Sequence, residues 1–363
     1  MPRTGSAQLK QIQPRQLFDG TLVVPPGYRS PLTLLEREIA IKFIKDDFEH
    51  ALGRALNLTR VSAPLTVLAD TGINDHLNGV EKPASFTIRV MHERAELVQS
   101  LAKWKRAALC DYGFEPGSGL YTDMNAIRPD EVLDNLHSLY VDQWDWERVI
   151  VREERTVRFL KTIVRAIYRV IRRAEHKVCA RYPSLPRPYL PPTIHFVHSE
   201  QLQERFPRLS PRERENAICR ERGAVFVIGI GAELGEGRPH DGRAADYDDW
   251  WTESELGRPG LNGDLFVWYP VLGRALELSS MGIRVDKRSL LKQLELKGEL
   301  AKSKLPYHQR LLRGELPLSI GGGIGQSRLC MLFLRLAHVG EVQVGIWPQK
   351  LRQTAAKHGI QLL

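Results

Sequence analysis

The chain lacks any apolar run that could cross a membrane. None of its apolar stretches approaches the roughly 18 residues that a membrane-spanning helix needs. The first twenty residues are basic and polar, without the apolar segment of a secretory signal. We therefore expect an intracellular, cytoplasmic protein without a membrane partner.

Cysteine is scarce as well. The 363 residues include only 4 cysteines, which are scattered along the chain without a C-x-x-C pair or a cysteine–histidine cluster. This pattern argues against a disulfide framework and against a structural zinc site. It predicts buried free thiols instead.

Common signatures of nucleotide and hydrolase chemistry are also missing. The chain has no G-x-x-x-x-G-K-[ST] phosphate loop and no H-E-x-x-H zinc motif, and the glycines of residues 229–237 lack the G-x-G-x-x-G spacing. The stretch GQSRL at 325–329 matches only half of a G-x-S-x-G elbow. These absences exclude P-loop enzymes and the common serine hydrolases.

What the chain has is an ordinary globular composition with excess positive charge. It is 42% hydrophobic and 26% charged, with a formal net charge of +9. Such an excess suits either a nucleic-acid partner or an anionic substrate. Much of it falls in residues 155–177, where apolar residues recur at helical spacing. We interpret this segment as a core helix with a solvated basic face, so nucleic acid is not an expected partner.

Hydrophobic periodicity predicts an α+β fold. Helical patterns cover residues 32–56, 153–181, 211–221, 287–303 and 325–337. Strand patterns cover residues 60–68, 85–91, 119–128, 137–146, 193–199, 224–231, 264–273 and 275–285. Because several strands follow one another without a helix between them, we expect a largely antiparallel β-sheet flanked by helices. Residues 1–30 show little periodicity and are interpreted as a basic N-terminal extension.

Four glycines occupy five positions at 321–325, just before Arg328 and an apolar helix. Glycine clusters of this kind mark backbone that passes close to something else. At a strand-to-helix junction, such backbone lets an adenine or a sugar lie against the chain, and a guanidinium can stack on the base or pair with phosphate. A tight turn that packs a core helix would explain the glycines equally well.

Aromatic and polar residues alternate in the stretch 137–147. Strand alternation places Gln143 and Asp145 on one face and the two tryptophans next to them on the other. Buried carboxylates need partners, and Lys105 and Arg128 are available. This predicts a polar pocket above an apolar core, with a purely structural salt-bridge network as the alternative.

The stretch 240–285 is acidic within a basic protein. Four aspartates fall within nine positions: Asp241, Asp246, Asp248 and Asp249. Asp264 and Glu277 then lie on successive predicted strands. Carboxylates in this arrangement suit Mg²⁺, which takes one or two carboxylates and fills its other positions with water and phosphate oxygens. The alternative is a solvated acidic loop.

Taken together, these stretches resemble one family, the ammonia-dependent asparagine synthetase A or aspartate–ammonia ligase, a relative of the catalytic core of class II aminoacyl-tRNA synthetases. The matching stretches are SLAKWKR, HSLYVDQWDWE, ADYDDW, GLNGD, ELSSMGIRV and GGGIGQSRL. IRPDE followed by YVDQWDWE resembles motif 2 of the class II enzymes, and GGGIGQSRL resembles motif 3. The resemblance runs from about Leu32 to Trp347 and implies a single catalytic domain over residues 31–363.

The activity implied by this resemblance is the ATP-dependent conversion of L-aspartate and ammonia to L-asparagine. The family forms β-aspartyl-AMP, releases pyrophosphate, and then lets ammonia displace AMP. Such a reaction needs positioning and charge neutralisation more than a protein nucleophile. A glutamine-dependent enzyme commonly carries a cysteine after the initiator methionine. Because Pro2 occupies that position here, free ammonium is the expected nitrogen source.

Roles for individual residues follow from the resemblance. Arg128 would hold the α-phosphate, and Arg328, with Gly323 and Gly325, would bind the rest of ATP. Aspartate or its adenylate would contact a polar set: Ser100, Lys105, Gln143, Asp145, Asp248, Ser279, Ser280 and Arg284.

Two ion-binding positions are also implied. Asp264 and Glu277 would hold Mg²⁺ on the phosphates, and Asp75 would receive ammonia and take its proton. Ammonium becomes a nucleophile only after losing a proton, so a carboxylate can attract the cation and help to deprotonate it. The surrounding loop, residues 72–79, departs from the family pattern.

The resemblance further implies a homodimer, built from a helix and strand near residues 32–68. The sequence also permits two alternatives to the ligase. A synthetase-like enzyme that passes the amino acid to tRNA is permitted by the fold and the charge, but no anticodon-binding domain is evident. An inactive nucleotide-binding paralogue would have lost one of six key residues, all of which are present: Asp75, Lys105, Arg128, Asp264, Glu277 and Arg328.

Overall fold

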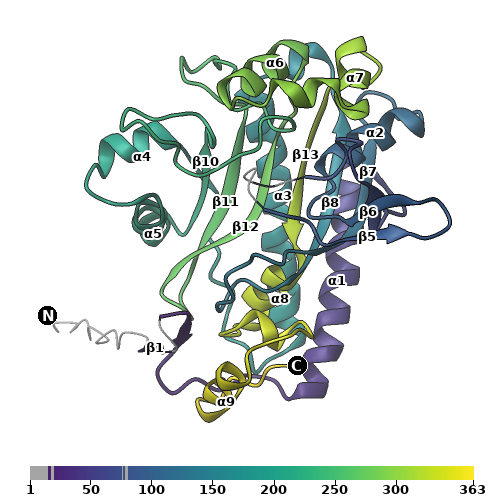
Figure 1. Cartoon of the computed structure of the whole chain (residues 1–363). Helices are drawn as coiled ribbons and strands as arrows, with labels where there is room; N and C mark the ends of the chain where they lie inside the picture. The colour runs from purple at the N-terminus through teal and green to yellow at the C-terminus, as the bar shows by residue number, and fades with distance from the viewer. Residues whose placement is uncertain (1–14, 18–19, 76, 78–80) are drawn as a thin grey trace, which may run out of the picture.

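The computed structural model describes residues 15–17, 20–75, 77 and 81–363 (Figure 1). Most of the basic extension predicted for residues 1–30, and several positions of the divergent loop at 72–79, lie outside the described residues. Within the described parts of the chain, no helix is long and apolar enough to span a membrane. All 4 cysteines are free thiols; Cys219 and Cys330 are buried as predicted, whereas Cys110 and Cys179 are only partly buried.

An eight-stranded sheet forms the centre of the molecule, in the order β3-β7-β8-β13-β12-β11-β10-β9. Its strands are β3 (Leu58–Arg60), β7 (Gly119–Ile127), β8 (Tyr140–Val149), β9 (His195–His198), β10 (Ala224–Ile228), β11 (Asn262–Tyr269), β12 (Arg274–Ile283) and β13 (Ser319–Gly325). Neighbouring strands are antiparallel except β3 with β7 and β9 with β10 at the two edges. The largely antiparallel α+β arrangement predicted from the sequence is confirmed.

Two smaller sheets flank the central one. Strands β1 (Arg15–Leu17) and β2 (Leu22–Val24) form a short antiparallel pair. Strands β4 (Thr66–Leu68), β6 (Glu93–Leu97) and β5 (Ser85–Ile88) form a three-stranded antiparallel sheet whose hairpin projects at the right of Figure 1. The strand predicted at residues 60–68 is thus two short strands in different sheets.

Three helices, α1 (Leu34–Leu56), α3 (Val157–Arg181) and α8 (Gln326–Leu334), contact one another and cover one face of the sheet (Figure 1). Thr33 caps α1 in a capping box with Glu36, and the Thr156 side chain accepts a hydrogen bond from the first turn of α3. The apolar stripe of α3 is buried in the core, while its basic residues lie largely on the other face of the helix. The interpretation of residues 155–177 as a core helix is confirmed.

The remaining helices show where periodicity fails. Helix α5 (Pro211–Arg222) confirms the helix predicted at residues 211–221. The helix predicted at residues 287–303 is too long: α6 (Lys287–Leu296) ends before Gly298, whose φ is positive, and a separate 3₁₀ turn follows, η2 (Leu300–Lys304). Helix α8 ends at Leu334 because Arg335 is left-handed. Four short helices were not predicted: α2 (Ala102–Asp111), α4 (Ser199–Arg205), α7 (Pro306–Arg313) and α9 (Gln349–Lys357). Two further 3₁₀ turns are η1 (Arg152–Glu154) and η3 (Val339–Glu341).

Candidate active site

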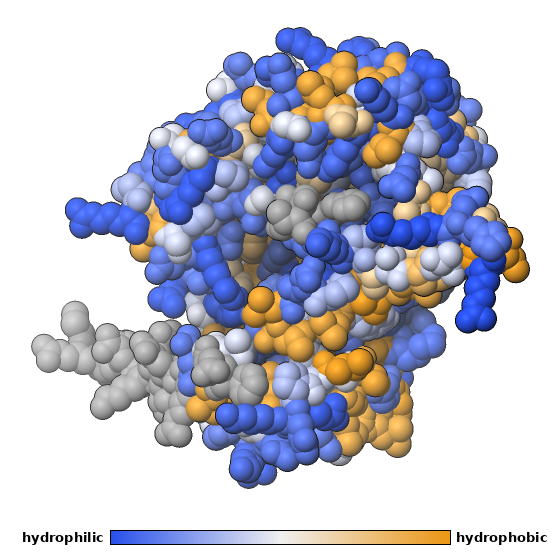
Figure 2. Space-filling view, viewed as in Figure 1, coloured by the Kyte–Doolittle hydropathy of each residue, from blue (hydrophilic) through white to orange (hydrophobic). Residues whose placement is uncertain are grey.

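A cavity of about 380 Å³ opens on the sheet face opposite α1, α3 and α8. Figure 2 shows a hollow near the middle of the molecule, rimmed mostly by hydrophilic residues. Residues far apart in the sequence line the cavity, from the loop at Asp75 to the start of α8 at Arg328. All the predicted site residues except Asp264 are among them, which brings the separate sequence motifs into one site.

The floor of the cavity follows from the alternation on β8. Trp144 and Trp146 are fully buried in the core, and Phe48 of α1 stacks on Trp144 with ring centroids 4.7 Å apart. Gln143 and Asp145 therefore point to the other face, where both line the cavity. The predicted polar pocket above an apolar core is present.

The glycines belong to β13, which pairs with β8. Gly323 lies opposite Asp145, and residues opposite each other on an antiparallel pair share a face. A Cβ at Gly323 would overlap Gln143 Oε1 and come within 2.7 Å of Asp145 Oδ1, and one at Gly321 would overlap Glu147 Oε2. The tight-turn explanation is therefore wrong: these glycines lie in a central strand and leave room for polar side chains that lie across it.

Lys105, from α2, is buried where it lines the cavity beside this floor. Its Nζ lies 2.9 Å from Asp145 Oδ2 and donates to the carbonyl oxygen of Gly322 at 2.9 Å. Burial lowers the pKa of the Lys105 ammonium despite the opposing effect of Asp145. Arg128, the other partner considered for these carboxylates, instead lies 4.0 Å from Glu131 and donates to Gln99 O at 3.4 Å.

A second buried cation, Arg284, is held between two carboxylates. Its Nε and Nη2 donate to Glu147 at 2.9 and 2.7 Å, and its Nη1 pairs with Asp248. Although burial alone would lower the pKa of Arg284, the two carboxylates hold it above its usual range. Ser319 also donates to Glu147, at 2.7 Å. Glu147, which the sequence analysis did not select, is thus the residue that fixes Arg284.

Asp264 and Glu277 come from adjacent strands, β11 and β12. A register irregularity between Leu265 and Phe266 places Glu277 opposite Phe266. Phe266 lies two residues after Asp264 on β11, so Glu277 and Asp264 lie on the same face of the sheet. Arg243 pairs with Asp264 and donates to Ser280 Oγ at 2.8 Å. Burial, together with the nearby charge of Glu277, raises the pKa of Asp264 despite Arg243. The two predicted metal-binding carboxylates are therefore near one another, but Asp264 is already paired with an arginine.

Arg243 is a site residue that the sequence prediction does not include, because the acidic pattern of the stretch 240–285 indicates only carboxylates. Its Nε also lies 3.9 Å from Asp248 Oδ2, so it connects two parts of the site. A single arginine at the start of such an acidic stretch was a usable signal, since buried carboxylates need cationic partners.

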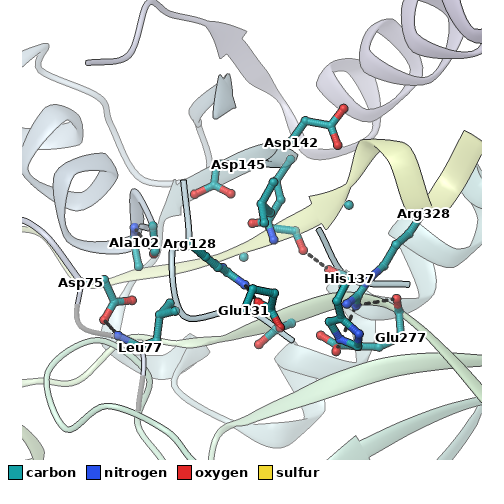
Figure 3. A pocket seen from close by; sticks show the side chains of 18 of the residues that line it. Asp75, Leu77, Ala102, Arg128, Glu131, His137, Asp142, Asp145, Glu277 and Arg328 are labelled. Carbon is teal, nitrogen blue, oxygen red and sulfur yellow. Dashed lines mark hydrogen bonds and ion pairs between the residues drawn. The ribbon is translucent and has the colours of Figure 1, made fainter. Parts of the chain in front are cut away.

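At one end of the cavity, Arg328 lies beside Glu277 and His137 (Figure 3). Its Nη1 donates to Glu277 Oε2 at 3.3 Å and to the Glu277 carbonyl at 3.2 Å. A second cavity of about 270 Å³ shares these three residues with the first, so open space continues around Arg328.

At the other end lies Asp75 (Figure 3). Asp75 is 1% exposed and lines the cavity, and its carboxyl group accepts a hydrogen bond from Leu77 N at 3.0 Å. Burial raises the pKa of Asp75, while Lys103 and a hydrogen bond from Ser100 act in the opposite direction. The preceding residue is anchored, because Asn74 donates to Glu96 and accepts from Gln99 N at 3.1 Å each.

Comparison with solved structures shows the fold. The asparaginyl-tRNA synthetase of Pyrococcus horikoshii in complex with asparaginyl-adenylate aligns with a TM-score of 0.65 at 16% identity, covering 86% of this chain and 70% of that one. The aspartyl-tRNA synthetase of Entamoeba histolytica aligns with a TM-score of 0.58 at 14% identity, covering 86% and 59%. The predicted class II synthetase-like fold is confirmed.

Comparison of sequences is more specific. The aspartate–ammonia ligase of Parabacteroides distasonis is 56% identical over 343 residues, covering 94% of this chain and 99% of its own. The enzyme of the same name from Limosilactobacillus fermentum is 53% identical over 345 residues, covering 94% and 100%. A sequence model of the aspartate–ammonia ligases, AsnA, matches residues 35–359. The chain belongs to the AsnA family of aspartate–ammonia ligases.

Proposed function

We propose that this protein makes L-asparagine from L-aspartate and ammonia, using ATP to form a β-aspartyl-AMP intermediate and releasing AMP and pyrophosphate. The observation that carries the proposal is one continuous cavity with a buried carboxylate, Asp75, at one end and Arg328 at the other. The first suits an ammonium ion, and the second suits a nucleotide.

The middle of the cavity suits the two charges of an amino acid. Lys105 and Arg284 can attract the α-carboxylate of aspartate, and Asp145 and Asp248 can accept hydrogen bonds from its ammonium group. Gln143, Ser100, Ser279 and Ser280 supply uncharged hydrogen-bonding groups in the same space. The buried ion pairs hold these side chains in place before the substrate arrives, which reduces the reorganisation that binding requires.

Arg128 is the cation best placed to act on the α-phosphate. Glu131 is 4.0 Å away, so most guanidinium donors of Arg128 can turn to a ligand in the cavity. As the β-carboxylate of aspartate attacks the α-phosphorus and the bond to pyrophosphate breaks, negative charge grows on the phosphate oxygens. A fixed guanidinium there stabilises the transition state more than the ground state. Arg328, with the open backbone at Gly325, would bind the nucleotide farther along the cavity.

Asp264 and Glu277 fit a magnesium ion on the phosphates. Their mutual repulsion contributes to the raised pKa of Asp264, and a cation between them would relieve it. Among the described residues, no group of three or more histidine, cysteine, aspartate or glutamate side chains could enclose a metal. Two carboxylates completed by phosphate oxygens agree with the usual coordination of Mg²⁺ in nucleotide enzymes. Bound there, the ion would neutralise charge on the leaving pyrophosphate.

Asp75 would serve the second half of the reaction. It can attract ammonium and accept one proton, after which the nitrogen attacks the β-carbonyl carbon and the bond to AMP breaks. A second proton leaves the nitrogen to give the neutral amide. Free ammonium, rather than glutamine, is the nitrogen source we propose, and the cytoplasm is the location we propose for the enzyme.

We also propose that the protein is a homodimer that uses α1. Leu35 and Ile39, one helical turn apart, are 71% and 51% exposed. Leu65, between α1 and β4, is 55% exposed. Exposed large apolar side chains can mark an interaction surface, and all three residues fall within the predicted dimer segment at residues 32–68.

One assay tests the ligase proposal. Purified protein is incubated with Mg²⁺, ATP and L-aspartate, with and without ammonium chloride, while pyrophosphate and asparagine are quantified. We expect asparagine to form only with ammonium, one for one with pyrophosphate. Adenylation without asparagine until tRNA is added would favour the synthetase-like alternative, and neither product would favour an inactive paralogue.

A further inference from the structure

Behind the ammonia end of the cavity lies a buried charge cluster that the proposed reaction has not yet used. Lys103 Nζ, from the first turn of α2, lies 2.8 Å from Asp246 Oδ2. His308 Nε2, from α7, lies 2.8 Å from the same oxygen. All three residues are at most 3% exposed, and they lie outside the lining of the main cavity.

Stability alone is a poor reason for such a cluster. Removing charges from water costs several kcal/mol per ion, and buried ion pairs can often be replaced by apolar residues without loss of stability. Buried charges that persist therefore call for another role, and the structure around this cluster points to Asp75.

Helix α7 holds the loop that carries Asp75. Tyr307 N donates to the carbonyl oxygen of Thr71 at 3.1 Å. A Cβ at Gly72 would come within 2.9 Å of His308 Nδ1, so the imidazole lies against the Gly72 backbone, whose φ is +77°. His308 thus contacts the Asp75 loop with one side of its ring and Asp246 with the other.

Lys103 supplies the charge in this arrangement. Several charged or titratable groups surround the Asp75 carboxyl group and the cluster: Lys103, Asp246, Tyr247, Tyr307 and His308. Burial and the negative charge of Asp246 raise the pKa of Asp75, and Lys103 opposes them. Although burial works against its charge, Asp246 and Asp75 together raise the pKa of Lys103, which keeps it a cation.

We propose that Lys103, held in place by Asp246 and His308, is a positioning residue that keeps Asp75 negatively charged and directed into the cavity for the ammonia step. The inference rests on the proposed role of Asp75 in receiving ammonium. Without Lys103, burial and the charge of Asp246 would raise the pKa of Asp75 further, which favours the protonated carboxyl group that cannot take a proton from ammonium. The adenylation step, in which Arg128 is proposed to act on the α-phosphate, would not need this charge.

The test separates the two half-reactions in the full-length protein. Adenylation is measured as aspartate-dependent ATP–pyrophosphate exchange without ammonium, and the second step as asparagine formation against ammonium concentration. For Lys103→Met we expect exchange to change little and kcat/KM for ammonium to fall by about 10²-fold. We also expect the acid limb of its pH profile to move to higher pH. Lys103→Arg, which keeps the charge, should retain much of the second step.

Hydroxylamine gives a readout that a merely structural role would not change. It is a weak base, uncharged at neutral pH, so it attacks the adenylate without first losing a proton. It forms aspartyl hydroxamate as AMP leaves. Lys103→Met should therefore retain a much larger fraction of wild-type activity with hydroxylamine than with ammonium. Lys292→Met, in which an exposed lysine 2.8 Å from Glu295 is lost, is the matched control and should behave as wild type.

Three results would overturn the proposal: wild-type use of ammonium by Lys103→Met, equal losses in exchange and asparagine formation, or equal losses with ammonium and hydroxylamine. Should Lys103→Met fail to fold, His308→Ala and His308→Gln replace it. His308→Ala should lose the ammonia step alone and His308→Gln should restore it, whereas equal losses in both steps again overturn the proposal. Asp75→Asn tests the proposed role of Asp75 separately from that of Lys103. If this variant uses ammonium as well as wild type does, Asp75 does not receive ammonium.

Discussion

Lys105 Nζ and Asp145 Oδ2 lie 2.9 Å apart, and their side chains are only 1% and 3% exposed. Lys105→Met would leave the Asp145 carboxylate buried without its cation, which typically costs about 3–5 kcal/mol of unfolding free energy. We expect lower stability in urea unfolding and loss of aspartate-dependent pyrophosphate exchange. A double variant, Lys105→Met with Asp145→Asn, should regain stability without regaining activity. A single variant as stable as wild type would contradict this account of the pair.

Gly323 should not tolerate even one methyl group. In Gly323→Ala the new Cβ would displace Gln143 and Asp145, and a displacement of about 1 Å in a substrate-positioning group can cost about 10²-fold in rate. We expect kcat/KM for aspartate to fall by about that factor. We also expect the variant to remain folded at the assay temperature, as its thermal unfolding midpoint would show. The matched control is Gly235→Ala, whose nearest neighbour would be Gln203 Oε1 at 3.7 Å. Equal effects in the two variants would show that the steric argument is wrong.

The features that sequence reasoning found are those encoded by local pattern. Alternation along β8 was enough to place Gln143 and Asp145 over a tryptophan core, and the long apolar period was enough to find α3. Helix α2 was missed because it is short, carries charged residues among its buried positions and has no side-chain cap at Leu101. Its formation depends on tertiary contacts with β8 more than on its own pattern.

The features that it missed are made by distant segments. Lys103 and Asp246 are separated by 143 positions, and Arg284 and Glu147 by 137. Nothing in the neighbourhood of either residue specifies such a pairing, because the sheet register brings the segments together only after folding. The function of the glycines could likewise be understood only once Gly323 was seen opposite Asp145.

His338 should make the protein sensitive to acid. Its Nδ1 accepts a hydrogen bond from Gly340 N at 3.0 Å and its ring packs on Trp347. Burial lowers the pKa of His338 to about 4. Below about pH 6.5, His338 therefore binds a proton in the unfolded chain but not in the folded chain. The free energy of unfolding thus decreases as the pH falls from there toward about 4.

This contribution can be isolated with His338→Asn, whose amide oxygen can still accept from Gly340 N. Between pH 7 and 4.5, wild type should lose about 2–3 kcal/mol of unfolding free energy relative to the variant, as measured in urea. Wild type must be compared with the variant because Glu341 has the opposite effect. Burial raises the pKa of Glu341 to about 7, so protonation of Glu341 stabilises the folded protein as the pH falls from 7 to 4.5. Parallel curves for the two proteins would rule out a role for His338.

Glu277 should control the magnesium requirement. In Glu277→Gln the remaining carboxylate, Asp264, is paired with Arg243, so we expect the Mg²⁺ concentration for half-maximal pyrophosphate exchange to rise by about tenfold or more. Chelation with EDTA should abolish exchange in wild type, and added Mg²⁺ should restore it. Glu295→Gln, an exposed change on α6, is the control. An unchanged Mg²⁺ dependence in Glu277→Gln would exclude this carboxylate as a ligand.

The exposed side of α1 should determine the oligomeric state. One chain has a mass of 41.3 kDa, and we expect light scattering at micromolar concentration to give about twice that value. Leu35→Asp combined with Ile39→Asp would place two charges in the proposed interface, where desolvation opposes association, so we expect this variant to be a monomer. Leu296→Asp changes a leucine of similar exposure, 54%, on α6 and should remain a dimer. A wild-type mass near that of one chain, or a double variant that still dimerises, would show that α1 does not form the interface.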